Sequence, residues 1–219
     1  MEKNVVIICD GTFPKREYPQ YLIASADFII CCDGALTKFL RHSKKIFGAE
    51  RLPDLVIGDM DTLSATMQKK YSDIIIRESE QEHNDQTKAV RWALNNIEDI
   101  SSIHILGATG GRADHTIGNL SLLMEYTRMF DLKDIYIEAV SDDGTIFPIT
   151  DTIEIDCGYG REISIFSPDT TLRIKSQGLM YKTDDVIFDN WWKATLNKAS
   201  DDKIRLEFNH PSIALIIMN

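Results

Sequence analysis

The first 140 residues alternate short apolar runs with segments whose apolar residues recur at helical spacing. In one such segment, Ala89, Trp92 and Ala93 fall on one helical face. This alternation is typical of a mostly parallel sheet with helices on both faces, so we expect a Rossmann-like α/β fold. The predicted strands are Val5–Cys9, Phe28–Cys32, Leu55–Ile57, Ile74–Ile76, Ile103–Leu106 and Ile135–Val140, and the predicted helices are Ala35–His42, Leu63–Tyr71, Thr87–Ile97 and His115–Phe130.

The helical period ends after Ser141-Asp142-Asp143-Gly144, and short β-type runs separated by turn residues such as Gly158 and Pro168 follow. This pattern predicts a C-terminal all-β sandwich domain. We therefore expect two domains, 1–141 and 142–219. The predicted strands of the second domain are Thr145–Pro148, Thr152–Ile155, Glu162–Phe166, Thr171–Ile174, Val186–Phe188, Ile204–Phe208 and Ile213–Met218.

Composition excludes some classes of function. The 219 residues carry a formal net charge of −10, whereas nucleic-acid-binding proteins normally present a basic surface. The N-terminal apolar run Val5–Cys9 is too short for a signal peptide or a membrane span, so we expect a cytoplasmic protein without membrane contact. The four cysteines lack metal-site spacing and are expected to be reduced thiols.

Two carboxylates lie two residues apart in Ile57-Gly58-Asp59-Met60-Asp61-Thr62, directly after a predicted strand. Side chains at such positions point the same way in an extended backbone, so Asp59 and Asp61 could bind one Mg²⁺. Alternatively, the segment is a turn in which Asp61 caps a helix beginning near Leu63. Taken alone, the motif favours the capped turn over the metal site.

Three further polar loops follow predicted strands of the same domain, and such loops converge at the carboxyl edge of a parallel sheet. The first two are Cys32-Asp33-Gly34-Ala35 and Gln81–Thr87, in which Asp33 and Asp85 either cap helices or face a metal. The third is Leu106–His115, whose glycines, Arg112 and following helix suit a phosphate. Together, the loops predict a site for a metal and a phosphate.

Taken together, these loops resemble thiamine pyrophosphokinases in order and approximate spacing. The matching elements are Asp33-Gly34-Ala35, Gly58-Asp59-Met60-Asp61, Gln81-x-x-Asn84-Asp85 and Gly110-Gly111-Arg112-Ala113-Asp114-His115. A weaker match continues in the second domain through Ser176–Tyr181 and Thr195-Leu196-Asn197. Asn84 stands where the family usually has Thr, and Ala194 and Leu196 replace two serines of the family's S-T-S-N stretch.

The resemblance implies transfer of the diphosphoryl group of ATP to thiamine, giving thiamine diphosphate and AMP, with Mg²⁺ as cofactor. Catalysis would depend on positioning and on electrostatic stabilisation, with Asp85 or Asp114 left to take the proton. The implied metal ligands are Asp59, Asp61, Asp85 and Asp33. The implied catalytic residues are Asp59, Asp61, Asp85, Asp114 and Arg112, and the implied nucleotide contacts are Asp33, Gly34, Gln81, Asn84, Gly110, Gly111, Arg112 and His115.

The second domain would bind thiamine through Thr195, Asn197 and Trp191. On a strand, one of Trp191 and Trp192 would face the core and the other solvent or a partner. Similar family members form homodimers with thiamine near the subunit interface, which we expect here. Three alternatives stay open: a diphosphokinase for another heteroaromatic alcohol such as a pterin, a glycosyltransferase-like enzyme, and a non-catalytic nucleotide or thiamine sensor.

Overall fold

The computed structural model describes residues 1–219, which form two compact units. The first unit comprises Met1–Leu122 and Leu132–Asp142, and the second comprises Leu123–Asp131 and Asp143–Asn219. Residues 123–131 group with the second unit, and the predicted domain boundary between residues 141 and 142 stays a prediction. None of the helices combines the length and the apolar character that crossing a bilayer requires.

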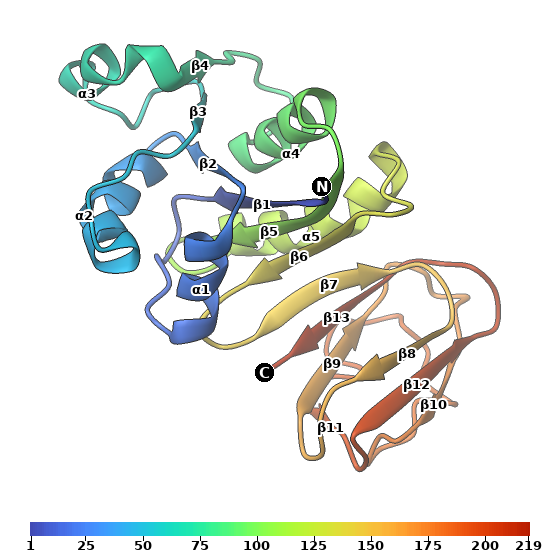
Figure 1. The fold of residues 1–219 in the computed structure, drawn as a ribbon. Coiled ribbons are helices and arrows are strands. Elements are labelled where there is room, and N and C mark those ends of the chain that lie inside the picture. Colours follow the sequence, from blue (N-terminus) through green and yellow to red (C-terminus); the bar gives the residue numbers. More distant parts are fainter. The chain divides into compact units, whose positions relative to one another are not determined.

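The first unit contains parallel strands in the order β6-β5-β1-β2-β3-β4 (Figure 1). The apolar runs are buried on both faces, as expected for a sheet covered by helices. The strands are β1 (Lys3–Ile8), β2 (Phe28–Cys32), β3 (Leu55–Gly58), β4 (Ile75–Arg77), β5 (Ile100–Leu106) and β6 (Tyr136–Val140). The helices are α1 (Glu17–Ser25), α2 (Ala35–Phe47), α3 (Ala65–Lys70), the 3-10 turn η1 (Ser72–Ile74), α4 (Asp85–Asn96) and the part of α5 (Ala113–Met129) that ends at Leu122.

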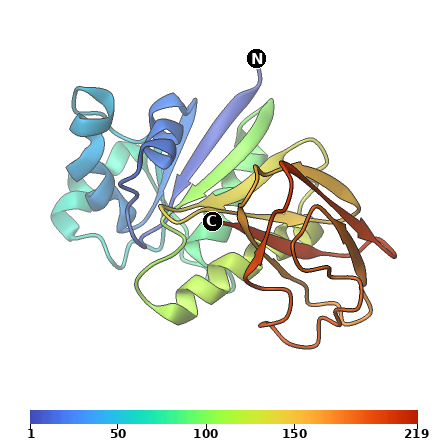
Figure 2. The ribbon, with the colours of Figure 1, turned by 90° about the horizontal axis from the view of Figure 1, so that it is seen from below.

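Helices cover both faces of this sheet. On one face, Ile23 of α1 and Phe39 of α2 pack with Val6 and Ile8 of β1 in a buried cluster. On the other face, α4 contacts β1, β2 and β3, and Figures 1 and 2 show it on the side opposite α1 and α2. The predicted α/β class and all six predicted strands of this unit are confirmed, whereas α1 was not predicted.

The second unit contains two antiparallel sheets, β11-β9-β13-β7 and β10-β12-β8, around one hydrophobic core. Alternate residues of β12, such as Ile204 and Leu206, enter that core while their neighbours face solvent. The strands are β7 (Thr145–Ile149), β8 (Ile153–Asp156), β9 (Glu162–Phe166), β10 (Ile174–Gln177), β11 (Asn197–Lys198), β12 (Lys203–Phe208) and β13 (Ala214–Met218). The predicted antiparallel β region is confirmed.

Three local predictions for this unit are wrong. The strand predicted at Thr171–Ile174 overlaps β10 only at Ile174, because residues 171–173 lie in a turn and loop. Val186–Phe188 is not a strand: Val186 N donates to Thr183 O in a turn, and Phe188 fills the core from a loop. Trp191 and Trp192 lie in turns rather than on a strand, and both are exposed, at 62% and 70%. Neither indole enters the core.

Candidate active site

A cleft of about 570 Å³ lies at the carboxyl ends of the parallel strands of the first unit. Its walls are the loops that follow β1, β2, β3, β4 and β5. In this sheet β1 lies between β2 and β5. Strands β2, β3 and β4 are added on one side of β1, and β5 and β6 are added on its other side, so the strand order reverses at β1. Ligands of open α/β sheets bind at such a switch point.

Three carboxylates form the acidic wall of the cleft. Oxygen atoms of Asp33, Asp59 and Asp61 lie within 4.8 Å of one another. Asp33 is only 3% exposed; its Oδ2 accepts from Thr62 N at 3.2 Å, and its buried Oδ1 has no hydrogen-bond partner. A hard divalent cation fits this set, because it takes carboxylate oxygens and would satisfy the orphaned Oδ1.

The backbone between the two aspartates is not extended, contrary to the prediction. Met60 has a left-handed φ of 66°, and its side chain is buried in the core beneath the loop. Gln68 Nε2 donates to Met60 O at 2.8 Å and to Leu63 O at 2.7 Å. The buried Met60 and this bridge leave Asp59 and Asp61 on the cleft side.

The pKa values of Asp59 and Asp61 are shifted in opposite directions. Donation from the backbone N–H of Asp61, and then from Gln81 Nε2, lowers the pKa of Asp59. The negative charge of Asp59 in turn raises the pKa of Asp61, since two close carboxylates disfavour joint ionisation. A cation between them would remove this repulsion.

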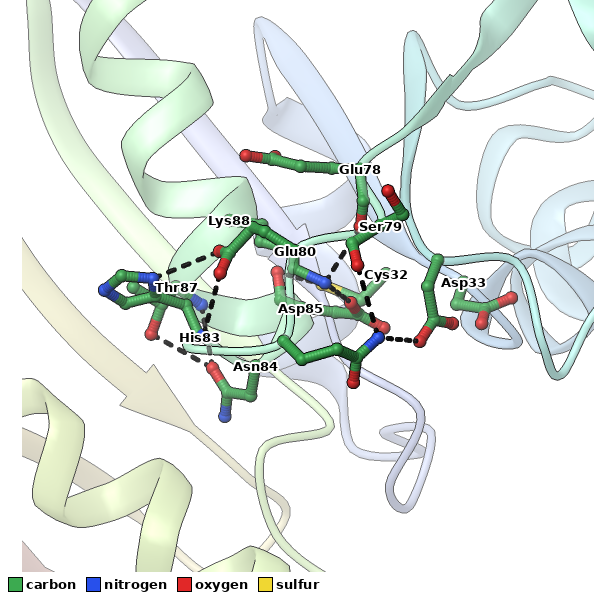
Figure 3. A network of polar contacts seen from close by, with 12 residues as sticks. Cys32, Asp33, Glu78, Ser79, Glu80, His83, Asn84, Asp85, Thr87 and Lys88 are labelled. Carbon is green, nitrogen blue, oxygen red and sulfur yellow. Dashed lines mark hydrogen bonds and ion pairs between the residues drawn. The ribbon is translucent and has the colours of Figure 1, made fainter.

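The loop between β4 and α4 places Asp85 beside the acidic wall (Figure 3). A Cβ added to Gly58 would lie 2.9 Å from Asp85 Oδ2 and 3.0 Å from Asp33 Cβ, so the glycine allows both side chains to approach β3. Burial raises the pKa of Asp85, and donation from Lys88 opposes that rise. Lys88 is 2% exposed and donates to Asp85 Oδ1 at 3.2 Å and Glu78 O at 3.0 Å.

The glycine-rich loop after β5 forms the opposite wall. Gly11 N donates to Gly107 O and Thr12 N donates to Thr109 O, both at 2.9 Å, so the loops after β1 and β5 lie backbone to backbone. The loop leads into the 17-residue helix α5, whose N-terminus favours anions.

Arg112 stands 72% exposed at the end of this loop and forms a forked ion pair with Asp114. Donation from Arg112 lowers the pKa of Asp114 to about 2. His115 also lines the cleft, and its backbone N donates to Asp114 Oδ1 at 2.9 Å.

We expect Gly110→Ala to disturb this wall more than Gly111→Ala. Both glycines have left-handed φ values, 82° and 86°, so each alanine should cost about 1–2 kcal/mol of backbone strain. A Cβ at Gly110 would lie only 1.9 Å from Thr12 Oγ1, whereas one at Gly111 meets nothing within 4 Å. The midpoint of thermal unfolding should therefore fall further in Gly110→Ala than in Gly111→Ala; equal falls would contradict the inferred packing.

The structure brings most first-unit candidates to one cleft, although Gly34 and Asp114 are not among its lining residues, and it adds residues that were not predicted. Asp33, Asp59, Asp61, Gln81, Asn84, Asp85, Gly110, Gly111, Arg112 and His115 line the cleft. Lys88, Asn119 and Asp10 also line it. Asp10-Gly11 repeats the Asp-Gly pattern of Asp33-Gly34 after a strand, so a signal for it was present in the sequence.

The second-unit candidates Trp191, Thr195 and Asn197 share one segment. Thr195 Oγ1 donates to Trp192 O at 2.6 Å. The Asn197 side chain is 4% exposed and is occupied by the main chain of Tyr181, donating to its O at 2.6 Å and accepting from its N at 3.1 Å. Asn197 thus fixes the position of the Tyr181 backbone.

Comparisons with known proteins cover both units. The model of the thiamin pyrophosphokinase catalytic domain matches residues 19–136, and that of the thiamin pyrophosphokinase substrate-binding domain matches residues 144–213. Thiamine pyrophosphokinase 1 of Oryza sativa subsp. japonica is 31% identical over 67% of this chain. Thiamin pyrophosphokinase 1 of Caenorhabditis elegans is 22% identical over 74% of this chain. The matched parts span 59% and 66% of these two relatives.

Solved structures are similar over nearly the whole chain. Thiamine pyrophosphokinase from Bacillus subtilis matches with a TM-score of 0.76 at 19% identity, covering 99% of both chains. The yeast thiamin pyrophosphokinase matches with a TM-score of 0.75 at 18% identity, covering 100% of this chain and 87% of that chain. At such identities, the similarity establishes the fold.

Proposed function

Because this chain belongs to the thiamin pyrophosphokinase family, we propose that it transfers the diphosphoryl group of ATP to thiamine, giving thiamine diphosphate and AMP. One observation carries the proposal beyond family membership: the orphaned Oδ1 of Asp33 lies in a carboxylate cluster within the same cleft as a glycine-rich loop and an arginine. Carboxylates alone would repel ATP, so the combination suits a nucleotide bound together with a cation.

We assign Asp33, Asp59 and Asp61, with Asp85 beside them, to a Mg²⁺ site. When bound, Mg²⁺ would offset phosphate charge and acidify the attacking hydroxyl group. Gln81 would keep Asp59 oriented through the contact of its Nε2 with Asp59 Oδ2 at 3.3 Å. This arrangement provides a charged acidic wall before any nucleotide arrives.

The opposite wall would hold the phosphates. The backbone amides of the glycine-rich loop, the N-terminus of α5 and the fork of Arg112 are all donors to phosphate oxygens. Charge that develops on these oxygens during transfer is best stabilised by donors already in place. Gly34 and His115 complete the proposed nucleotide contacts, whereas the Asn84 carboxamide is engaged within the protein by Thr87 N and Asn119 Oδ1.

Asp85 is a better proton acceptor for the thiamine hydroxyl than Asp114. Burial raises the pKa of Asp85, whereas Arg112 holds the pKa of Asp114 at about 2. A base is more effective as its pKa approaches the working pH. We therefore propose that Asp114 orients Arg112 and that Asp85 accepts the proton. The cation would be held by Asp33, Asp59 and Asp61, which leaves the Asp85 carboxylate free of the cation.

Incubation with ATP, Mg²⁺ and thiamine tests the proposed function. We expect AMP and thiamine diphosphate in equal amounts, and no product when Mg²⁺ is chelated. Formation of ADP would indicate an ordinary kinase, and the absence of any product would contradict the enzymatic assignment.

We propose that the second unit binds thiamine through Trp191 and Thr195, with Asn197 fixing the shape of the segment. An exposed indole can stack on an aminopyrimidine or face a thiazolium cation. Trp191→Ala should raise the KM for thiamine about tenfold, while the KM for ATP should stay unchanged. Tyr159→Ala, at an exposed aromatic residue elsewhere in the same unit, is the control, and equal effects of the two substitutions would contradict the assignment.

We also propose a cytoplasmic homodimer with thiamine near the subunit interface. All four cysteines are free, as in proteins of reducing compartments. Trp191, Trp192 and Leu196 are 62%, 70% and 85% exposed, which suits a contact surface. A monomer mass in sedimentation at micromolar concentration would contradict the dimer.

A further inference from the structure

Asn119 of α5 makes three hydrogen bonds to two other segments, the N-terminus of α4 and the loop after β5. Its Oδ1 accepts from Asn84 Nδ2 at 2.8 Å, and its Nδ2 donates to Ala108 O at 3.0 Å. Its backbone O accepts from Gln86 Nε2 at 3.0 Å. One residue therefore joins the N-terminus of α4 and the glycine-rich loop after β5.

The direction of this hydrogen-bond chain is fixed at both ends. Thr87 N can only donate, and it donates to Asn84 Oδ1 at 3.0 Å; Ala108 O can only accept. Each carboxamide between them must therefore accept on one side and donate on the other. Asn84 performs two tasks, capping α4 with its oxygen and reaching Asn119 with its nitrogen.

This series of hydrogen bonds connects the two sides of the cleft. Asn84 directly precedes Asp85, which lies beside the acidic wall. Ala108 belongs to the glycine-rich loop that leads to Arg112. Any shift of Asn119 would therefore be transmitted to both walls at once.

We propose that Asn119 is a positioning residue that sets the spacing between the acidic wall and the phosphate-binding loop through Asn84 and Ala108. As an effect on catalysis, this inference rests on the proposed function. The correct spacing allows ATP and its cation to contact both walls together, so its loss weakens ATP binding before it affects thiamine.

Two uncharged substitutions test the relay. Asn84→Ser keeps a good helix cap but is too short to reach Asn119, and Asn119→Ala removes both carboxamide contacts. Each should raise the KM for ATP about threefold to tenfold, with the KM for thiamine unchanged. Asn96→Ser, at the other end of α4, is the matched control and should leave both constants unchanged.

The double variant distinguishes a relay from two separate structural effects. If Asn84 acts through Asn119, then Asn84→Ser in the Asn119→Ala background should raise the KM for ATP no further. Multiplied effects on KM, or lowered thermal midpoints with an unchanged KM for ATP, would overturn the proposal.

Hydrogen exchange gives a readout that needs no turnover. Amides of residues 107–112 should exchange faster in Asn84→Ser and in Asn119→Ala than in the wild-type protein or in Asn96→Ser. Unchanged exchange in these amides would overturn the inference even in an active enzyme. If the wild-type protein makes no AMP, the proposed function fails, and this comparison still decides the structural coupling.

Discussion

Asp59→Asn and Asp61→Asn are each expected to lower turnover about a thousandfold at saturating ATP and thiamine, without loss of the fold. The expected loss is large because the amide removes the negative charge that the proposed cation needs. The fold should tolerate the change, because the charge of Asp59 already raises the pKa of Asp61 and the substitution relieves that repulsion. Steady-state AMP formation and thermal unfolding measure the two effects.

Asp73→Asn is the control for these variants, because Asp73 is exposed and lies in η1, outside the residues that line the cleft. Mg²⁺ should raise the unfolding midpoint of the wild-type protein and of Asp73→Asn by binding the folded state. It should not do so for Asp59→Asn. If Asp59→Asn retained more than about a tenth of wild-type turnover, the assignment of the acidic wall to the cation would be wrong.

The parallel sheet could be predicted because its inner strands β1, β2 and β3 are buried on both faces and therefore appear as continuous apolar runs. The helix α1 could not be recognised in the same way. It is nine residues long, contains Pro19 near its start, and has only Leu22 and Ile23 as buried aliphatic side chains. Its position depends on packing against the sheet more than on its own periodicity.

The candidate site was predictable where it lies on strand ends. Asp33, Asp59 and Asp85 follow different strands, and parallel topology alone brings such positions to one edge. Asn119 gave no comparable signal, since its partner Asn84 lies 35 residues away and an asparagine within a helix is ordinary. Lys88 was missed for a similar reason: only the tertiary structure shows that its ammonium group is buried against Asp85.

The second unit was harder to predict because its short strands and its ordered loops contain the same types of residue, including apolar ones. Phe188 fills the core from a loop, and β11 has only two residues. Ala194 and Leu196 adopt left-handed φ values of 58° and 56°, which no sequence pattern would assign to non-glycine residues. The proposed thiamine contacts lie in this segment and therefore stay a prediction.

Arg112→Ala should raise the KM for ATP about tenfold to a hundredfold, with little change in the KM for thiamine. Arg112 is 72% exposed and contacts Asp114 at the start of its own helix, so the thermal midpoint should stay near that of the wild-type protein. Arg112→Lys keeps the charge but loses the planar fork, and an intermediate KM would identify the forked contact as the source of affinity.

The ion pair with Asp114 explains why this effect should not depend on pH. Asp114, with a pKa of about 2, stays ionised throughout the neutral range, as does a guanidinium group. A phosphate must therefore displace or share a partner that is always present, and Arg112 is held in a forked orientation before ATP binds. The ratio of the ATP KM values of Arg112→Ala and wild type should consequently be constant across the neutral range. A ratio that falls towards one as the pH changes would mean that another titrating group, rather than Arg112, binds the phosphates.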